Sequence, residues 1–289
     1  MSSTTAITHI SDTARVVAHC RALESARPDA WFQDTFAERL AGPPGAYFAR
    51  QLGDAELIAR SIAVRTVVFD EIILDCIASR EVDFVVSLAA GLDARPWRLP
   101  LPRSLCWVDV DLPELLRYKG DMLRAERPLC HYRSVAADLA DKSARRELIA
   151  ACGDLGRRGL VLTEGLLVYL SPTEVAVIAR ELADTASIHY WLSDLVGPPA
   201  LDHLRTVWQP IVAGSDIRFQ FAPSDGPSFF EPLGWREARY VSSVEEAGRR
   251  GRSPLSRWAR MLLWLGTAAR REAVRRLSGT ALLQRLEAS

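Results

Sequence analysis

Along the first 80 residues, apolar side chains recur every three or four positions, which is the spacing of one helix face. Ser11 and Asp12 are placed to cap a first helix, and a second is expected over Asp34–Leu40, ending at Gly42-Pro43-Pro44. A longer helix is expected over Ala55–Ser79, because its apolar stripe contains Ile58, Ile62, Phe69, Ile72 and Cys76. The pattern therefore predicts a helical N-terminal part over residues 1–80.

From Asp83 onward the pattern changes to short apolar runs, rich in β-branched residues and separated by helical stretches. Helix starts are expected at Pro113, at Asp141 and at Ser171, where a proline and Glu174 follow the capping serine. Alternating strands and helices are typical of an α/β protein with a mostly parallel sheet. The expected strands are Phe84–Leu88, Cys106–Val110, Tyr132–Val135, Leu160–Thr163 and Ile188–Leu195.

The alternation stops after Asp194. Residues 196–232 are rich in proline and aromatic side chains, and we expect them to form an inserted cap of short helices and loops. A strand is expected over Trp235–Val241, a basic helix from Ser253-Pro254 and a last strand over Thr280–Leu286. Since no repeat or low-complexity linker divides the sequence, we expect a single domain over residues 1–289.

Composition narrows the class of protein. Hydrophobic residues make up 48% and charged residues 25% of the chain, which is typical of soluble globular proteins and excludes a disordered one. Basic and acidic residues balance at 36 each, which argues against a protein that binds nucleic acid over its whole surface. The five cysteines and five histidines are scattered without zinc spacing, so we expect reduced thiols, no metal site and a cytoplasmic location. The polar N-terminus and the lack of a long apolar run predict neither a signal peptide nor a membrane span.

Small residues or carboxylates follow four consecutive predicted strands, at Ala89-Ala90-Gly91, Asp111, Asp138 and Glu164. The carboxyl ends of parallel strands meet at one sheet edge, where ligands bind, so we expect one site there. Gly91 suits a turn that approaches a ligand closely. A carboxylate 20 residues later, at Asp111, suits the two ribose hydroxyls of an adenosine.

An adenosine site leaves two cofactors open, a nicotinamide dinucleotide and S-adenosylmethionine. A dinucleotide needs a glycine-rich turn and a long helix whose N-terminus holds the pyrophosphate. In this chain Asp93 would lie where the phosphates must go, and Pro96 denies a long helix, so S-adenosylmethionine fits better. A nicotinamide-dependent Rossmann oxidoreductase remains the alternative.

Arg65 falls on the apolar stripe of the helix expected over Ala55–Ser79. A buried arginine needs an anion, because an unpaired buried charge is very costly. That anion is either a carboxylate of the protein core or the carboxylate or phosphate of a ligand, and the sequence leaves both open. S-adenosylmethionine carries a carboxylate of the required kind.

Several motifs can be taken together: Arg65-Thr66, Val85–Leu99, Asp109–Pro113, Asp138-Leu139, Thr163–Leu170 and Phe230–Trp235. With them the chain resembles the leucine carboxyl methyltransferase family over nearly its whole length. It is most similar to the bacterial branch of S-adenosylmethionine-dependent O-methyltransferases of polyketide and related metabolism. The family usually has glycine where this chain has Ala89, and the extra methyl group is expected to narrow the turn and weaken cofactor binding.

The resemblance implies a class I methyltransferase (Rossmann-like) fold, with a seven-stranded sheet, helices on both faces and an antiparallel last strand. It implies that Arg65 holds the methionine carboxylate of S-adenosylmethionine and that Glu164 lies near its amino group. The other cofactor contacts that it implies are Ala89 and Gly91 at the methionine part, Asp111 and Leu112 at the ribose, and Asp138 and Leu139 at the adenine.

The resemblance also implies methyl transfer to a carboxylate or hydroxyl of a small apolar or aromatic metabolite, of the polyketide type. A carboxylate is ionised at neutral pH and needs no base, whereas a phenol needs one. The candidate bases are Tyr169, His189 and His203. Aromatic residues between Trp208 and Phe230 indicate either an apolar acceptor pocket or plain packing of the cap on the sheet.

The segment Ala247–Ser289 holds ten arginines and two acidic residues. Such a segment is typical of proteins that bind RNA or a membrane surface. Trp258, Leu262 and Leu265 share a helix face, which favours instead an amphipathic helix with a solvated basic side. A non-catalytic adenosine- or RNA-binding protein is therefore a further alternative, but the expected partner is a small molecule and not a nucleic acid or a membrane.

Overall fold

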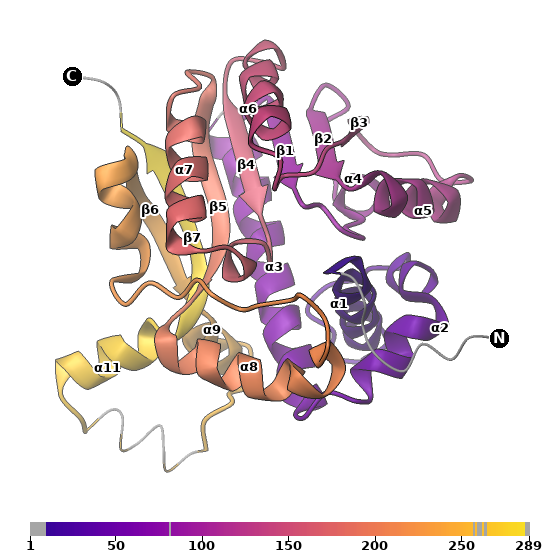
Figure 1. Ribbon diagram of the computed structural model, residues 1–289. Helices are drawn as coiled ribbons and strands as arrows, with labels where there is room; N and C mark the ends of the chain where they lie inside the picture. Colours follow the sequence, from indigo (N-terminus) through magenta and orange to yellow (C-terminus); the bar gives the residue numbers. More distant parts are fainter. Residues whose placement is uncertain (1–9, 81, 257, 259–261, 263–264, 287–289) are drawn as a thin grey trace.

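A seven-stranded sheet forms the centre of the molecule, in the order β3-β2-β1-β4-β5-β7-β6 (Figure 1). The computed structural model describes residues 10–80, 82–256, 258, 262 and 265–286. Strand β7 runs antiparallel to both of its neighbours, and the other six strands are mutually parallel, so the predicted sheet is confirmed. The strands are β1 (Phe84–Leu88), β2 (Cys106–Asp111), β3 (His131–Ala136), β4 (Gly159–Thr163), β5 (Ile188–Val196), β6 (Trp235–Ser242) and β7 (Ser278–Arg285).

The helices begin largely where local capping signals predict. Pro113 starts α5, Asp141 caps α6, and Ser171 and Glu174 form a capping box at the start of α7. The α-helices are α1 (Ile10–Ser25), α2 (Ala37–Ala49), α3 (Ala55–Ser79), α4 (Arg95–Arg98), α5 (Pro113–Leu123), α6 (Lys142–Ala151), α7 (Pro172–Ala183), α8 (Pro198–Val212), α9 (Ser243–Arg249) and α11 (Ala268–Arg275). Short 3-10 helices are η1 (Cys152–Asp154), η2 (Leu167–Tyr169) and η3 (Gly226–Leu233).

Two N-terminal boundaries differ from the prediction. Helix α1 begins at Ile10, so Ser11 and Asp12 lie within its first turn. Helix α2 does not end at Gly42, where φ is 58° and the helical conformation is interrupted. It resumes at the following two prolines and ends at Ala49, because proline is compatible with the first turn of a helix.

The basic C-terminal part also departs from the prediction. Residues 253–256 are not helical, so the expected helix does not begin at Ser253-Pro254, although Trp258 and Leu262 are helical; residues 257, 259–261 and 263–264 lie outside the described residues. Its expected apolar stripe is exposed at Trp258, Leu262 and Leu265. Several of its arginines pair with carboxylates of earlier elements, namely Arg250 with Glu71, Arg252 with Glu24 and Arg276 with Glu237. Part of the positive charge that suggested RNA binding is thus neutralised within the protein.

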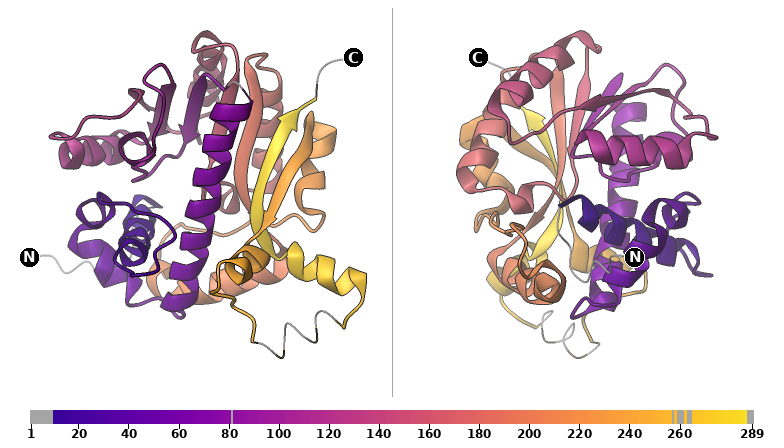
Figure 2. Two further views of the ribbon diagram at one scale, coloured as in Figure 1. Left: turned by 180° about the vertical axis from the view of Figure 1, so that it is seen from behind. Right: turned by 45° about the vertical axis from the view of Figure 1, so that its right-hand side comes forward.

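One face of the sheet packs against α3. Phe69, Ile72 and Cys76 of this helix are fully buried, and they belong to one cluster with Val85 and Leu160 of the sheet. The predicted apolar stripe is therefore confirmed. Figure 2 shows α3 running along the sheet over its whole height, which carries its N-terminal half past the strand ends.

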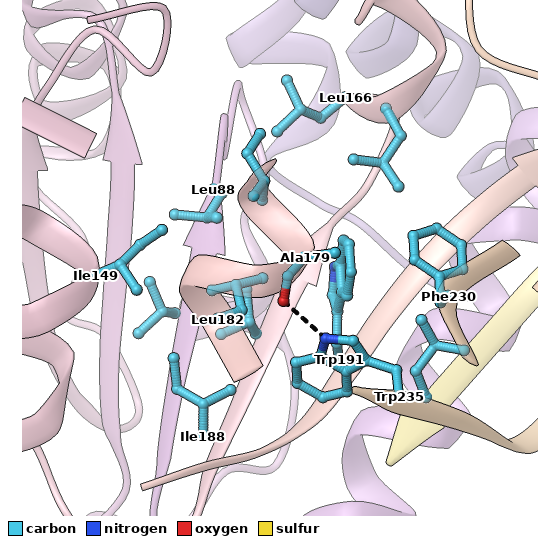
Figure 3. Packing of buried hydrophobic residues seen from close by; sticks show 14 of the residues in the cluster. Leu88, Ile149, Leu166, Ala179, Leu182, Ile188, Trp191, Phe230 and Trp235 are labelled. Carbon is cyan, nitrogen blue, oxygen red and sulfur yellow. Dashed lines mark hydrogen bonds between the residues drawn. The ribbon is translucent and has the colours of Figure 1, made fainter. Parts of the chain in front are cut away.

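The other face packs against α6, α7 and η3 (Figure 3). Trp191 lies edge-on to Phe230 and to Trp235, with ring centroids 5.0 and 5.6 Å apart. Trp235 Nε1 donates a hydrogen bond to the Ala179 carbonyl at 2.9 Å. Removing a buried aromatic ring of this kind costs about 3–5 kcal/mol, so the packing fixes both ends of the connection between β5 and β6.

That connection forms the expected cap, although its main element is a regular 15-residue helix, α8, and not a short one. Helices α1, α2 and α8 lie across the carboxyl ends of the parallel strands (Figures 1 and 2). A third apolar cluster joins them, with Val16 of α1, Ile58 and Ile62 of α3, and Trp208 of α8. The N-terminal part and the cap therefore cover the sheet edge at which the site is expected.

The five cysteines are buried free thiols. Burial raises the pKa of Cys20 and of Cys76 to about 12, and that of Cys130 and of Cys152 to about 11. These thiols therefore stay protonated at neutral pH. In the part of the chain that the structure describes, no helix is long and apolar enough to cross a membrane.

Candidate active site

A cavity of about 220 Å³ lies at the carboxyl ends of β1, β2, β4 and β5, beside α1, α3 and α8. Its two ends differ in chemistry. The charged end consists of Arg65, Asp93, Glu164 and Asp194 on the wall, with Arg95 ion-paired behind them. The aromatic end consists of Tyr169, Trp208 and Phe219.

The turn after β1 carries the predicted small residues. Gly91 has a φ of 55°, and its amide donates to Asp111 Oδ2 at 2.7 Å. The other oxygen of Asp111 accepts from the Leu112 amide at 2.7 Å. Burial raises the pKa of Asp111, and these two hydrogen bonds oppose that rise. Asp111 therefore ties the two strand ends together and is also part of the cavity lining.

Ala89 also has a positive φ, of 52°, and is the one residue other than glycine with this property in the described part of the chain. A left-handed conformation costs an alanine about 1–2 kcal/mol, because its Cβ lies too close to the following carbonyl oxygen. The backbone at Ala89 is thus the one that glycine favours, although the residue is not glycine. Its side chain lies on the cavity wall.

Arg65 has protein carboxylates as partners. Its Nε lies 3.0 Å from Glu164 Oε1, and its Nη1 lies 3.1 Å from Asp194 Oδ2. The interpretation of Arg65 as one half of a core ion pair is confirmed. A ligand carboxylate as an additional partner stays a prediction.

Arg95 is the centre of the charged end, although the sequence did not single it out. Its guanidinium lies 2.6 Å from Asp70, 3.0 Å from Asp93 and 2.6 Å from Glu164. Burial alone would raise the pKa of Asp93 and of Glu164, but the combined charge of Arg95 and the other nearby cations outweighs it, and both pKa values lie below the usual ones. Both carboxylates are therefore ionised at neutral pH.

The buried and partly buried charges around the turn do not balance. The cations are Arg21, Arg65, Arg95, Arg98 and Lys119, and the anions are Asp34, Asp70, Asp93, Asp109, Asp111, Glu164 and Asp194. The excess of carboxylates favours a cationic ligand and disfavours a pyrophosphate. Helix α4, which follows the turn after β1, spans only Arg95–Arg98, so the site also lacks the long helix that a dinucleotide needs. Both observations weigh against the nicotinamide alternative.

At the aromatic end, the ring of Phe219 contacts the rings of both Tyr169 and Trp208. The centroid of Phe219 lies 5.2 Å from that of Tyr169 and 6.1 Å from that of Trp208. These rings belong to the buried cluster under the cap and also line the cavity, so both interpretations of the aromatic stretch hold for them. Burial raises the pKa of Tyr169, so its hydroxyl stays protonated and cannot serve as a base near neutral pH.

The family model of leucine carboxyl methyltransferases matches residues 14–183, which include the turn after β1, Asp111 and the charged end as far as Glu164. The chain belongs to the leucine carboxyl methyltransferase family. The predicted family is therefore confirmed, and the name of that family describes a methyltransferase.

Relatives in this family bear the name "putative S-adenosyl-L-methionine-dependent methyltransferase". One from Mycolicibacterium gilvum is 37% identical over 180 residues, which cover 56% of this chain and 58% of the relative. One from Streptomyces coelicolor is 35% identical over 61% of this chain and 65% of its own length. Matches of this kind span less than two thirds of those relatives. One from Saccharopolyspora erythraea is 32% identical over 89% of this chain and 93% of its own length.

Two solved structures share the fold of this family member at low sequence identity. A "putative methyltransferase" from Thermobifida fusca superposes with a TM-score of 0.60 at 15% identity, over 99% of this chain and 97% of the other. A DUF574 family protein from Streptomyces avermitilis gives a TM-score of 0.59 at 12% identity, over 96% and 97%. The predicted class I methyltransferase fold is therefore confirmed.

Two of the predicted bases do not line the cavity. His189 lies at the start of β5, at the opposite edge of the sheet, with Nδ1 2.9 Å from the Ser187 carbonyl oxygen. His203 is exposed, because Leu204 and Trp208, four residues apart on α8, are the ones that face the cavity. The predicted catalytic role is wrong for both histidines.

Three predicted cofactor contacts also lie off the cavity wall. Asp138 is exposed, and its Oδ1 accepts a hydrogen bond from the Ala140 amide. Leu139 packs against the core cluster, and Leu112 is the N-cap of α5. Asp138 and Leu139 follow β3, an edge strand whose end is farther from the charged end than the ends of β1 and β4 are. The roles of these two residues and of Leu112 in cofactor binding stay predictions.

The sequence reasoning missed Arg95 and Asp194 as members of the site. Asp194 interrupts the apolar run of β5, and its Oδ1 accepts from the Gly165 amide at 2.6 Å. An acidic residue inside a buried strand was the available signal, since such a residue needs partners. Among the described residues, no group of three or more His, Cys, Asp or Glu side chains is arranged to hold a metal ion.

Proposed function

We propose that this protein is an S-adenosylmethionine-dependent O-methyltransferase that methylates the carboxylate of a small apolar acid. The observation that carries the proposal is one continuous cavity with a charged end and an aromatic end, in which the described residues provide no histidine as a base. Tyr169 is protonated, and Asp93 and Glu164 have lowered pKa values, so none of these three is suited to act as a base at neutral pH. An acceptor that is already ionised needs no such base.

The residues present fit the cofactor. Asp111 would accept hydrogen bonds from the ribose, and the turn at Gly91 allows close approach of the main chain. Arg65 would face the methionine carboxylate, and Glu164 and Asp194 would face the amino group. The excess of carboxylates matches a ligand with one net positive charge. When bound, S-adenosylmethionine supplies a methyl group activated by a positively charged sulfur.

The aromatic end would exclude water from the acceptor and orient it. Its rings exclude water from the acceptor carboxylate, which makes that oxygen a stronger nucleophile. The rigid wall that Tyr169 and Phe219 form also limits the orientations of an apolar body, and alignment of this kind supplies much of the rate in methyl transfer. A small acid of the polyketide type has the apolar body and the carboxylate that this wall and charge pattern favour.

The test is methyl transfer to matched acids and alcohols. The protein is incubated with S-adenosylmethionine labelled in its methyl group and with octanoate, phenylacetate or cinnamate, beside octanol and phenol. Label is expected in the acids only, and mild base should release it as methanol, because esters hydrolyse and ethers do not. Base-stable label in phenol or octanol alone would contradict carboxyl transfer. Binding of NADH without binding of S-adenosylhomocysteine would overturn the whole proposal.

A further inference from the structure

The cavity has a third part, which belongs to neither the charged end nor the aromatic end. It lies where α3 contacts β7 and α9 (Figure 2). Hydroxyl side chains line it, namely those of Ser61 on α3, Ser243 on α9, and Ser278 and Thr280 on β7. We call these four residues the hydroxyl arm. Ser61 is exposed whereas Thr280 is buried, so Thr280 marks the inner part of the arm.

The alternation of side chains along β7 places Thr280 beside the charged end. Leu282 packs in the cluster between the sheet and α3, so Thr280, two residues earlier, faces the same side. Asp194 lies directly opposite Thr280 in the pairing of β5 with β7. Side chains opposite each other on one sheet face have Cβ atoms about 5 Å apart. Because Asp194 is ion-paired with Arg65, the inner part of the hydroxyl arm adjoins the charged end.

The hydroxyl of Thr280 has no partner within the protein. Thr280 is 2% exposed, and no residue that the structure describes is hydrogen-bonded to its Oγ1. Thr66 Oγ1 and Ser187 Oγ also lack partners, but no water-sized group reaches them and neither residue lines the cavity. Thr280 Oγ1, by contrast, is open to such a group. A molecule that enters the cavity can therefore provide the hydrogen bond that this buried hydroxyl lacks.

The lining of the arm favours a neutral polar group. Its inner end is the pair of Arg65 and Asp194, whose charges cancel, and the four members of the arm are themselves uncharged. A hydroxyl group both donates and accepts hydrogen bonds, so a ligand hydroxyl can pair with Thr280 Oγ1 in either direction. The same ligand hydroxyl has a second bond left for a neighbouring serine. An apolar chain would leave these groups without partners.

The position of the arm indicates where on the acceptor this hydroxyl lies. The proposed reaction places the acceptor carboxylate at the charged end, beside the cofactor. Thr280 is about one strand spacing from Asp194, so its hydroxyl is within reach of a substituent a few bonds from that carboxylate. The apolar body of the same acceptor would extend in another direction, to the aromatic end.

We infer that the hydroxyl arm binds a hydroxyl group of the acceptor close to the reacting carboxylate, and that Thr280 determines specificity for it. This inference rests on the proposed carboxyl methylation and narrows its substrate class. The acceptor is then a hydroxy acid with an apolar body.

The experiment compares wild type with Thr280→Val and Thr280→Ser. Valine keeps the shape of threonine and removes the hydroxyl, whereas serine keeps the hydroxyl. The acceptors are octanoate and its 2-, 3- and 7-hydroxy derivatives, and the readout is kcat/KM for formation of the methyl ester. In wild type the 2- or the 3-hydroxy acid should exceed octanoate about threefold to tenfold, and the 7-hydroxy acid should not. Thr280→Val should reduce that ratio to about one, and Thr280→Ser should retain most of it.

Thr185→Val is the matched control. Thr185 lies beyond the end of α7 and outside the cavity lining, and its hydroxyl donates to the Glu181 carbonyl at 3.2 Å. The same substitution there should leave the ratio of hydroxy acid to octanoate at its wild-type value.

The outcomes separate the two proposals. If wild type methylates no acid, the proposed function fails and the inference fails with it. If wild type methylates octanoate and the 2- and 3-hydroxy acids equally well, carboxyl methylation stands and the hydroxyl arm binds only solvent. A wild-type ratio in Thr280→Val also overturns the inference, even where all rates fall together, since an equal fall is the result of altered packing. Loss of the ratio in Thr280→Ser as well would assign it to the methyl group and overturn the role of the hydroxyl.

Discussion

The two ends of the cavity are stabilised in different ways. At the charged end, Arg95 contacts three carboxylates and Glu164 contacts two arginines, so each group depends on several others. At the aromatic end, Phe219 contacts Tyr169 on one side and Trp208 on the other, and the three rings are held by packing. Removing one member of a coupled buried ion pair leaves a charge uncompensated, whereas trimming a packed ring costs only its own contacts. Substitutions at the charged end should therefore affect folding and cofactor together, and those at the aromatic end chiefly the acceptor.

The largest difference between the two ends is expected for Arg65→Leu. The variant keeps an apolar side chain on α3 but leaves Glu164 and Asp194 without their shared cation, so the free energy of unfolding without ligand should fall by about 3–5 kcal/mol. Urea unfolding measures the loss. Trp208→Phe, at the other end, is the matched control and should lower stability less than Arg65→Leu does, because it loses only packing contacts.

The loss in Arg65→Leu should depend on pH. In wild type the pKa of Glu164 lies below its usual value of 4.5, so its contribution to stability is complete at neutral pH and is lost as the pH falls through the folded-state pKa. Without Arg65 the pKa of Glu164 should rise, and its protonation would remove part of the unpaired charge. The difference in stability from wild type should therefore be smaller at pH 5 than at pH 8. An equal difference at both pH values would show that charge is not its cause.

The two ends should also differ in their effect on cofactor binding. Asp111→Ala removes a carboxylate that is part of the cavity lining and anchors the turn at Gly91, so S-adenosylhomocysteine should bind about 2–4 kcal/mol more weakly. Calorimetric titration measures this. Phe219→Leu, at the aromatic end, should bind the same ligand as wild type does. A wild-type dissociation constant for folded Asp111→Ala would contradict the assigned role.

The smallest expected effect concerns the turn itself. Ala89→Gly relieves a left-handed alanine and should raise the free energy of unfolding by about 0.5–1 kcal/mol, since part of the gain is lost to glycine's greater freedom when unfolded. Gly91→Ala is the reciprocal variant. Its φ is 55° and the added Cβ would lie 3.4 Å from Ala14 Cβ, so stability should fall by about 1 kcal/mol or more. Thermal unfolding of the pair measures both, and a change of the same sign in the two would count against backbone strain.

The sequence predicted the charged end better than the aromatic end, for a physical reason. Strands β1 and β4 are buried on both faces and read as continuous apolar runs, so the residues that follow them could be placed at one sheet edge. The long stripe of α3 placed Arg65 at a buried position in the same way. Periodicity fixes such positions without knowledge of tertiary contacts.

The partners of these residues were harder to predict. Arg95 meets Asp70, 25 positions earlier, and Glu164, 69 positions later, and no local pattern indicates either pairing. The exposure of His203 follows from the apolar stripe of α8, in which Leu201, Leu204, Trp208 and Ile211 recur every three or four residues, but the sequence analysis did not recognise this helix. The cap was predicted as short helices and loops, because its prolines obscured a longer helix that begins at Pro198 and contains Pro210.

The position of Arg95 has a consequence for how the molecule opens. It joins α3, the turn after β1 and the end of β4, so the charged end cannot open locally without leaving several buried charges unpaired. Helix α8 has no comparable tie, and its described link to the start of α3 is a single main-chain hydrogen bond beside apolar packing. Amide hydrogens around the charged end should therefore exchange with solvent only through global unfolding, while those of α8 exchange through small openings of the cap. Ligands would then come and go on the side of the cap, and their exchange would leave the ion-paired part of the molecule undisturbed.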